Sequence, residues 1–299
     1  MTFQAGVSRR GFLIRGSVAT GGLLAGPALL SACSKDDSEP GSRLDSLKSE
    51  GKITVGIAGE QPYAFLDHGE LTGEDPTVQK AIWKAVGIEN VEAKQVAFES
   101  LIPGLNAGDF DVIAAGMFIN PDRCEQAAFS EPMYCAPNAF MVPSGNPDNI
   151  SDFESVAAAG IKLGVFSGAV EGDYAKTAGV KSSNIVTVPD MPTAATQLEQ
   201  GRIGAIALTS ITLNWHLEQN PDLDAEVTEP FTPVVDGEEV LGCGAAVFRK
   251  EDTDLVEAFN KELAKLKESG ELTEMIEQFG FGPETLPPDD VTTESLCGG

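Results

Sequence analysis

Positive charge is scarce in this chain of 299 residues. It holds 20 Lys and Arg against 46 Asp and Glu, which gives a formal net charge of −26 at pH 7. A surface this acidic repels phosphate groups, so nucleic acids and anionic membranes are excluded as natural partners. The same acidity favours solubility in salty media, where surface carboxylates are screened from one another. An ordinary acidic soluble protein would have the same composition, so a salt-adapted source is one of two interpretations.

Histidine and the usual catalytic motifs are scarce as well. The chain has only two histidines, His68 and His216, and the sequence has no Cys-x-x-Cys pair and no His-assisted metal spacing. Nucleophile elbows and phosphate-binding loops are also missing from the sequence. General acid–base chemistry would depend on Glu60 alone. We therefore expect a binding protein rather than an enzyme, with no metal and no cofactor.

Long apolar runs are lacking at the N-terminus. The segment 16–30 is short and broken by glycines, which excludes a transmembrane helix. It follows Arg9-Arg10, which resembles a twin-arginine export motif, and precedes Leu30-Ser31-Ala32-Cys33, which resembles a lipobox. We expect residues 1–33 to be a lipoprotein signal, Cys33 to carry the lipid anchor outside the cytoplasm, and 34–47 to be a flexible tether. A plain cleaved signal with an incidental cysteine is the alternative.

Four further cysteines remain after Cys33. Outside the cytoplasm some of Cys124, Cys135, Cys243 and Cys297 can pair, with three possible connectivities if all of them do. Cys135 and Cys243 flank the two segments in which we expect the chain to cross between its two folded halves, so they are the candidate pair. Buried free thiols are the alternative.

Strands and helices alternate along the chain in two successive units. The first unit has expected strands at 53–58, 91–96 and 111–115, with helices at 75–86 and 100–106. The second, after Pro143, has strands at 161–166, 185–188 and 203–208, with helices into Tyr174, at 193–200 and at 211–217. Such alternation predicts two α/β units with largely parallel sheets. Extended segments follow from 225, a strand at 240–248 returns to the first unit, and helices are expected at 253–268 and 272–279.

The stretch 98–134 has the strongest functional signal. Its buried strand, 111–115, is expected to break at Gly116, and Asn120-Pro121 indicates the start of a helix. Phe118 and Arg123 therefore lie where a strand ends and a helix begins, which is where ligands bind in open α/β sheets. Helix N-termini favour anions, and an arginine offers a planar fork that matches a carboxylate. The pattern predicts a carboxylate receptor with an aromatic wall.

This stretch resembles the extracytoplasmic solute-binding proteins of the polar amino acid class (family 3), which serve ABC importers. The similarity is carried by 100–105, 107–108, 110–117, 123–126 and 129–130, and the resemblance spans roughly 52–281. Within that class it is most similar to ectoine/hydroxyectoine-binding proteins. The resemblance implies a two-lobed type II periplasmic-binding-protein fold with two crossover strands as hinge. Lobe 1 would comprise 48–139 plus 239–285, lobe 2 would comprise 140–238, and 286–299 would be a loose tail.

Five residues fall in loops after expected strands of the first lobe: Glu60, Tyr63, Phe98, Phe118 and Arg123. Three are aromatic, in a chain with only 7% aromatic residues. Aromatic faces attract cations, a carboxylate pairs with cationic N–H groups, and an arginine binds a carboxylate. The set predicts a small zwitterionic ligand with a delocalised cation. Taken singly, each residue also has a plain role, as a core ring, turn packing or a surface ion pair.

In ectoine-binding proteins, as the resemblance implies, three rings hold the ligand's cyclic amidinium, an acid contacts its nitrogens and an arginine holds its carboxylate. By this resemblance, Tyr63, Phe98 and Phe118 would be the three rings. Glu60 would be the acid and Arg123 the arginine. Tyr and Phe are exchanged at the first two ring positions relative to the expected pattern. From lobe 2, backbone N–H groups of Gly168 and Ala169 are expected to face the carboxylate.

The segment 204–210 contains no carboxylate, although amino acid binders of this class usually place an Asp there. This absence argues against an ordinary α-amino acid as ligand. We therefore expect a monomeric binding protein that delivers ectoine or hydroxyectoine to ABC permease subunits. A general polar amino acid binder, a periplasmic dehydratase-type enzyme on the same fold and a sensory module are the alternatives.

Overall fold

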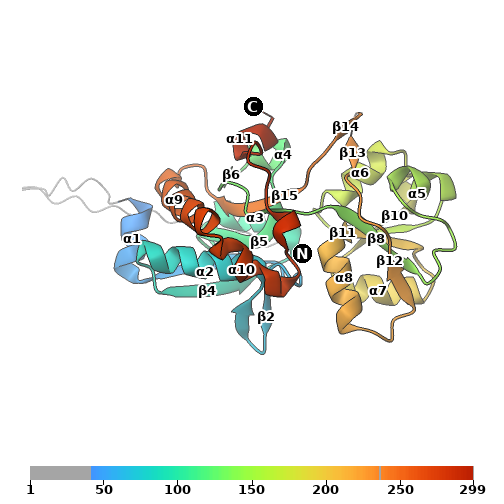
Figure 1. Cartoon of the computed structure of the whole chain (residues 1–299), viewed down its shortest axis with the longest axis horizontal. Coiled ribbons are helices and arrows are strands. Elements are labelled where there is room, and N and C mark those ends of the chain that lie inside the picture. The colour runs from blue at the N-terminus through green and yellow to red at the C-terminus, as the bar shows by residue number, and fades with distance from the viewer. Residues whose placement is uncertain (1–41, 236, 299) are drawn as a thin grey trace, which may run out of the picture. The chain divides into compact units, whose positions relative to one another are not determined.

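The structure, a computed structural model, describes residues 42–235 and 237–298. These residues belong to one compact unit, and the expected signal, lipid attachment site and most of the tether lie outside them. None of the described helices is both long and apolar enough to cross a membrane. Two main sheets, each covered by helices, form two lobes (Figure 1).

The sheet of lobe 1 has the order β4-β1-β5-β15-β6, with β7 paired to β15. The strands β4 and β5 run parallel to β1, as the alternating pattern predicts, whereas β15 is antiparallel to β5. Its strands are β1 (Lys52–Ile57), β4 (Asn90–Gln95), β5 (Val112–Phe118), β6 (Ala128–Phe129), β7 (Tyr134–Cys135) and β15 (Cys243–Phe248). A separate hairpin is formed by β2 (Phe65–Asp67) and β3 (Glu70–Thr72).

Helices cover both faces of this sheet because alternate residues of β5 point to opposite sides. Val112 and Ala114 pack into one core, whereas Ile113 and Ala115 pack into another. The first core is closed by α2 (Glu74–Val86), α9 (Thr253–Ser269) and α10 (Glu271–Ile276), which lie together in Figure 1. The second is closed by α3 (Leu101–Asn106). The helix α2 ends at Gly87 in the left-handed conformation, as its sequence predicts.

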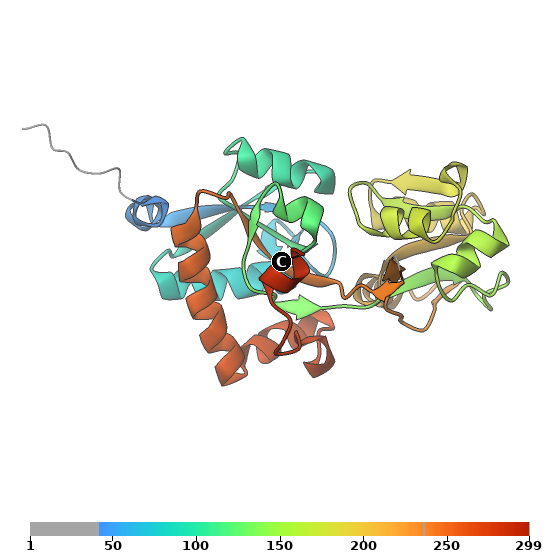
Figure 2. The same ribbon diagram turned by 90° about the horizontal axis from the view of Figure 1, so that it is seen from above.

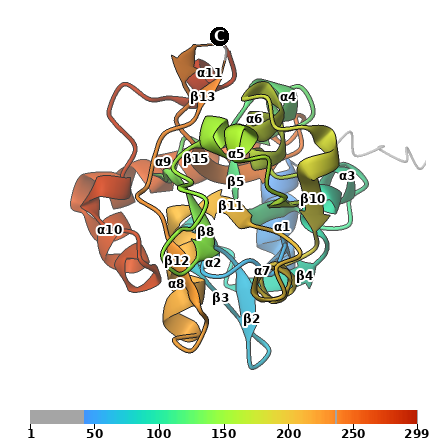
Figure 3. The same ribbon diagram turned by 90° about the vertical axis from the view of Figure 1, so that its right-hand side faces the viewer.

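Lobe 2 has its own five-stranded sheet, in the order β10-β9-β11-β8-β12. The helices α7 and α8 pack on one face and α5 and α6 on the other (Figure 3). Its elements are β8 (Asn138–Pro143), α5 (Phe153–Ala159), β9 (Leu163–Phe166), α6 (Glu171–Thr177), β10 (Ile185–Val188), α7 (Met191–Glu199), β11 (Ala205–Thr209), α8 (Ser210–Gln219) and β12 (Ala225–Val227).

The chain crosses between the sheets twice, from β7 into β8 and from β12 back to β15 (Figure 2). A small hairpin, β13 (Val234–Val235) with β14 (Glu238–Glu239), lies on the return path. Cys135 and Cys243 are partners in the β7–β15 ladder and form a disulfide. The candidate pair from the sequence is therefore confirmed, and the disulfide joins the two crossing segments at their lobe 1 ends.

The expectation of a flexible tether over 34–47 is wrong for its last residues. A helix, α1 (Arg43–Glu50), starts there because the Ser42 hydroxyl accepts a hydrogen bond from the backbone N–H of Asp45. Leu47 is buried in the lobe 1 core, and the Arg43 guanidinium pairs with Asp111. This segment is therefore packed onto lobe 1.

The expectation of a loose tail at 286–299 is also wrong. Cys297 forms a disulfide with Cys124, and a short helix, α11 (Thr293–Leu296), precedes it. The Thr293 hydroxyl donates to the Ser130 carbonyl oxygen at 2.6 Å. A covalent bond and hydrogen bonds from Thr293 thus hold this segment against lobe 1.

A third expectation, that Gly116 ends its strand, is wrong as well, because β5 continues to Phe118. Gly116 has φ +57°, and the register against β15 shifts beside it. Glycine adopts this conformation without steric cost, so the strand is distorted rather than ended.

Candidate functional site

Parallel pairing brings the predicted loops of lobe 1 to one edge of its sheet. Glu60 and Tyr63 follow β1, Phe98 follows β4 in a 3₁₀ turn (Phe98–Ser100), and Phe118 is the last residue of β5. Since these three strands are parallel, their carboxyl ends lie side by side. This is the edge at which open α/β sheets bind ligands.

Arg123 is held at this edge by a short helix, α4 (Pro121–Cys124). Its backbone N–H donates to the Asn120 side-chain oxygen at 2.9 Å, so the predicted helix start is confirmed. The Arg123 guanidinium donates to the carbonyl oxygens of Phe118, at 2.7 Å, and Gly168, at 3.0 Å. Burial lowers the pKa of Arg123, yet a guanidinium remains charged in proteins. A buried, oriented cation results.

Six of the seven predicted site residues line one small cavity between the lobes, which we name the inner cavity. Its volume is about 40 Å³, enough for one or two water molecules. The side chains and backbone around it come from Glu60, Tyr63, Phe98, Gly116, Phe118, Arg123, Phe166, Ala169, Val170, Glu171, Leu208 and Thr209. The seventh predicted residue, Gly168, is not among them but accepts the hydrogen bond from Arg123. Residues separated by more than 100 positions in sequence thus converge.

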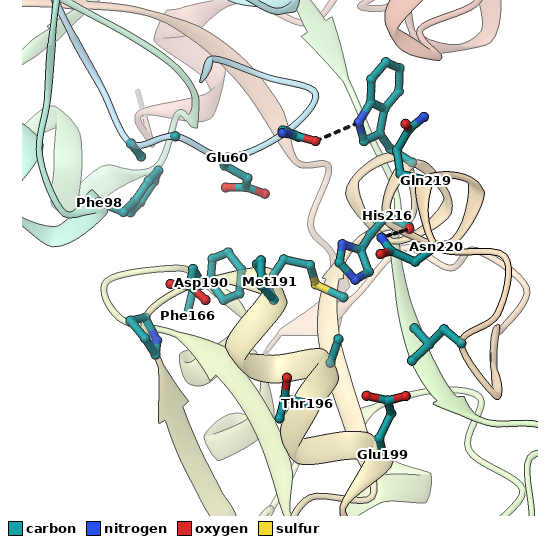
Figure 4. Close-up of a pocket in the computed structure, with 18 of the residues that line it drawn as sticks. Glu60, Phe98, Phe166, Asp190, Met191, Thr196, Glu199, His216, Gln219 and Asn220 are labelled. Atoms are coloured by element: carbon teal, nitrogen blue, oxygen red, sulfur yellow. Dashed lines mark hydrogen bonds between the residues drawn. The ribbon is translucent and has the colours of Figure 1, made fainter. Parts of the chain in front are cut away.

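A larger space, the outer cavity, adjoins the inner one and has a volume of about 670 Å³. The two share Glu60, Phe98 and Phe166. Figure 4 shows Glu60 and Phe98 on the lobe 1 side, facing Phe166 and Met191 of lobe 2. The two cavities therefore lie side by side between the lobes.

Glu60 carries the lobe 1 carboxylate of this site. Its side chain accepts a hydrogen bond from the Thr212 hydroxyl at 2.8 Å, a contact from lobe 1 to α8 of lobe 2. Burial raises the pKa of Glu60, the Thr212 hydroxyl opposes the rise and the nearby carboxylate of Glu171 adds to it, so that the pKa is about 7. Glu60 therefore changes charge near neutral pH.

The predicted rings do not all face the cavity in the same way. The Phe98 ring lies over the Arg123 guanidinium, with 5.4 Å from its centroid to Cζ, so it shields the arginine. Tyr63 packs against Tyr134, with ring centroids 5.3 Å apart, and its hydroxyl donates to the Thr209 hydroxyl at 3.0 Å. A fourth ring, Phe166 of lobe 2, lines the cavity and was missed in the sequence.

The backbone contribution expected from lobe 2 differs from the structure. The Ala169 N–H donates to the Phe166 carbonyl oxygen at 3.3 Å and is thus engaged within its own turn. Gly168 contributes its carbonyl group, which accepts from Arg123. The expectation that both N–H groups face a ligand carboxylate is therefore not met for Ala169, because the tight turn uses its donor.

A carboxylate from lobe 2 is present, although the sequence argument expected none. The segment 204–210 indeed lacks one, but Glu171 at the start of α6 lines the inner cavity. It is 3% exposed and accepts from the Asn138 side chain at 2.9 Å. The expectation that lobe 2 offers no carboxylate is therefore wrong, and the absence in 204–210 does not exclude a ligand with an α-ammonium group. The available clue was position, since Glu171 follows the Gly168 turn that was expected to face the ligand.

The two histidines lie apart from this constellation. His68 is exposed at the turn between β2 and β3, whereas His216 belongs to α8 and lines the outer cavity. In 42–235 and 237–298, no three or more His, Cys, Asp or Glu side chains are grouped to hold a metal ion. The inner cavity offers one guanidinium, two carboxylates and several rings, which suit the binding of a charged organic molecule.

Comparisons with known proteins agree with this geometry. The family model described as bacterial extracellular solute-binding proteins, family 3, matches residues 53–283. A probable amino-acid ABC transporter periplasmic-binding protein, y4tE, of Sinorhizobium fredii is 35% identical over 259 residues, 85% of each chain.

Two solved structures are also similar. EhuB in complex with hydroxyectoine has a TM-score of 0.78 and 35% identity, over 85% of this chain and 97% of that one. An ancestral arginine-binding protein bound to arginine has a TM-score of 0.68 and 30% identity, over 77% of this chain and 98% of that one. Both the two-lobed type II fold and the family predicted from the sequence are confirmed. The chain belongs to the family 3 bacterial extracellular solute-binding proteins, which places it outside the cytoplasm as the binding component of an amino acid-type ABC importer.

Proposed function

We propose that this protein captures ectoine or hydroxyectoine and delivers it to an ABC permease. The observation that carries the proposal is the buried Arg123 guanidinium, which lines one cavity with Glu60 and the rings of Tyr63, Phe98 and Phe118. The similarity to EhuB, solved with hydroxyectoine, supports the same ligand class.

The chemistry of each group fits one part of such a zwitterion. The guanidinium of Arg123 has five N–H donors. One on each terminal nitrogen donates to a carbonyl oxygen, and the others have no partner among the described residues, so they can bind a carboxylate. The ionised Glu60 attracts a cationic N–H group, and aromatic faces stabilise a delocalised cation by about 0.5–2 kcal/mol per contact. These contacts are made in a water-poor space, where salt screens little.

Ligand entry requires the lobes to separate, because the inner cavity holds only about 40 Å³. Among the described residues, three hydrogen bonds join the lobes at the inner cavity, Thr212 to Glu60, Tyr63 to Thr209 and Arg123 to Gly168. A fourth, from Trp215 to Gln61 at 3.2 Å, joins them at the outer cavity. A ligand that contacts both lobes would replace them and favour reclosure about the crossing segments.

The proposal is tested by calorimetric titration of residues 34–299. Ectoine, hydroxyectoine, glycine betaine, proline, arginine and glutamate would each be added at about 0.1 and 1 M NaCl. We expect ectoine or hydroxyectoine to bind most tightly at both salt concentrations. Arg123→Ala should lose about 100-fold in affinity, because a buried charged partner is removed. Phe118→Ala should lose about 3- to 30-fold. The matched control is Arg202→Ala, an exposed arginine of lobe 2, which should bind as the wild type does.

A general polar amino acid binder is the second candidate. Glu171 favours it, because a lobe 2 carboxylate is available to an α-ammonium group. Tightest binding of arginine or glutamate in the titration would establish this candidate and refute the ectoine proposal. We propose that the protein is not an enzyme, and conversion of the bound ligand to a product during incubation would overturn that.

We also propose that Cys33 carries a lipid anchor after twin-arginine export, and that the protein acts as a monomer. The support is the sequence motif at 30–33, which the described residues do not include. In cells, the wild type should fractionate with membranes and Cys33→Ser should be released. A Cys33→Ser protein that remains membrane-bound would refute the anchor.

A further inference from the structure

A buried carboxylate of lobe 2 has no role in the recognition scheme above. Glu171 is the first residue of α6, is 3% exposed and lines the inner cavity together with Glu60 and Arg123. Charged side chains are seldom fully buried without a partner. In this structure no salt bridge links Glu171 to another described residue, so its carboxylate is a candidate for contact with a ligand.

The orientation of Glu171 is fixed by lobe 2 itself. The side-chain amide of Asn138 donates to Glu171 Oε1 at 2.9 Å and to the Leu208 carbonyl oxygen at 3.3 Å. Asn138 is 1% exposed and is bridged through its backbone to Phe231, at 2.8 and 3.0 Å. A central strand of the lobe 2 sheet thus holds the carboxylate at the cavity.

The described residues around the inner cavity carry more acidic than basic groups. Two carboxylates, one from each lobe, face a single guanidinium. A zwitterion that gives its carboxylate to Arg123 would leave its cation to the two acids. Each acid has a hydrogen-bond donor in the protein, Thr212 for Glu60 and Asn138 for Glu171, and its remaining lone pairs can accept N–H groups from a ligand. A cation with two N–H donors satisfies both acids, whereas a quaternary ammonium group has none to offer.

We infer that Glu171 is a specificity-determining residue: together with Glu60 it selects ligands whose cation carries at least two N–H donors. Cyclic amidinium and ammonium groups qualify, and quaternary ammonium groups are rejected. Because the two acids belong to different lobes, the same contact favours the closed state. This inference rests on the proposed function, in that the inner cavity holds a zwitterion.

The test compares Glu171→Gln with Asp173→Asn, an exposed residue two positions further along the same helix. Thermal unfolding first verifies that both variants fold. Calorimetry then measures ectoine, as the N–H-bearing probe, and glycine betaine, as the probe without N–H groups. We expect Glu171→Gln to weaken ectoine binding about ten- to hundredfold and to reduce the ectoine-to-betaine affinity ratio by a similar factor. Asp173→Asn should leave both within about twofold.

A pH series separates a direct role from a packing role. Glu171 raises the pKa of Glu60 through like-charge repulsion. In Glu171→Gln, the pH below which ligand affinity declines should therefore move to lower pH, which a change in packing alone would not produce. Unchanged ectoine affinity, or an equal loss for both probes without a shift in pH profile, would overturn the inference while the proposed function stands.

The outcomes of the two proposals remain distinguishable. If the wild type does not bind ectoine but binds arginine or glutamate, the proposed function fails. The affinity of Glu171→Gln is then measured with that amino acid. A loss there supports the inference, and no loss refutes it. If glycine betaine binds best, or none of the N–H-bearing ligands binds, both proposals fail.

Discussion

Glu74, the first residue of α2, is fully buried, and neither of its carboxylate oxygens has a hydrogen-bond partner among the described residues. Its neighbour Asp75, by contrast, accepts from the Gly116 N–H at 3.0 Å and the Gln79 amide at 2.9 Å. Burial raises the pKa of Glu74 well above its ordinary value of 4.5, and the charge of Asp75 adds to this. Burial therefore favours the protonated form of Glu74 in the folded protein.

Glu74→Met should stabilise the protein, most strongly at alkaline pH. With a raised folded pKa, the contribution of Glu74 to stability is fully present below 4.5 and is lost as pH rises toward the folded pKa. Methionine has similar length and needs no proton. At pH 8 we expect a gain of about 1–3 kcal/mol in the free energy of unfolding, measured with urea, and a smaller gain at pH 4.5. Glu70→Met, at an exposed position, is the control. Equal gains at both pH values would contradict this account.

Glu60 makes ligand affinity dependent on pH. Because the pKa of Glu60 is about 7, the carboxylate is increasingly protonated below pH 7 and then attracts a cation less. We expect affinity to be constant above about pH 8 and to fall toward tenfold per pH unit below 7. Calorimetry with the tightest-binding ligand across pH 5–9 would measure this. An affinity that rises on acidification would exclude Glu60 as the acid.

Thr212→Val tests the cause of that dependence. The Thr212 hydroxyl donates to the Glu60 carboxylate at 2.8 Å and so favours its ionised form. Valine has the same shape without the donor, so the pKa of Glu60 should rise and the decline in affinity should begin at higher pH. Thr187→Val, at an exposed site on β10, should leave the profile unchanged. A shift to lower pH in Thr212→Val would contradict the role given to this hydroxyl.

A site residue could be predicted from the sequence when its place in the fold is set by neighbouring residues, and could not when it depends on distant contacts. The positions of Phe118 and Arg123 were predicted correctly because neighbouring residues indicate both the end of the strand and the start of the helix. Glu171 was missed because its burial depends on Asn138, 33 positions away in the chain. Its position after the turn at Gly168 was a local clue, but whether the carboxylate faces the cavity or solvent depends on the contact with Asn138.

At the scale of elements, the C-terminal segment supports the helix that carries Arg123. Cys124, the next residue, is bonded to Cys297, a separation of 173 residues. The Thr293 N–H and hydroxyl add hydrogen bonds to the side chain of Glu131 and the carbonyl of Ser130. Since α4 has only four residues, it has little stability of its own. The disulfide therefore fixes the position of α4 on lobe 1.

Replacing both cysteines, in Cys124→Ser/Cys297→Ser, should release the C-terminal segment. We expect a loss of about 2–5 kcal/mol in the free energy of unfolding. Limited proteolysis with mass spectrometry should find new cleavage within 286–298, and the affinity of Arg123-dependent ligands should fall several-fold. The control, Cys135→Ser/Cys243→Ser, should leave 286–298 protected. Continued protection in the first variant would show that the hydrogen bonds alone hold the segment.

Sequence patterns fared best for elements whose limits are set locally. Gly87 ends α2 and Asn120 caps α4, as predicted, because both signals act within one helical turn. Sequence patterns were least reliable where pairing with a distant segment decides where an element ends. The strand β5 continues past Gly116 because β15, more than 120 positions later, still pairs with its end at Phe118. The C-terminal segment is ordered by a bond that no local pattern encodes.

At the scale of the molecule, the tandem βα units predicted two α/β lobes, which the two sheets confirm. The return of the chain to the first sheet, expected from the strand at 240–248, is confirmed by β15, whose residues are buried throughout and pair with β5, β6 and β7. A fully apolar strand of this kind indicates a central position in a sheet but not which sheet.

Whole-molecule charge leads to the last prediction, on salt. With 46 acidic and 20 basic residues, surface carboxylates repel one another, and salt shortens the range of that repulsion from about 10 Å at 0.1 M to about 3 Å at 1 M. The unfolding temperature should therefore rise by several degrees, mostly below about 0.5 M NaCl, where screening changes fastest. Differential scanning calorimetry across 0.05–2 M NaCl measures this. A rise that is linear in salt would instead indicate a general solvent effect.

Ligand affinity should respond differently in the same salt series. We expect the contacts of Arg123 and Glu60 with a ligand to be enclosed once the lobes close on it, where salt screens charges little. We expect the dissociation constant to change less than about threefold between 0.1 and 1 M NaCl, while the unfolding temperature rises. A tenfold or greater weakening would mean that the ligand is held by exposed charges, as in a surface site, rather than by the buried arginine and carboxylates.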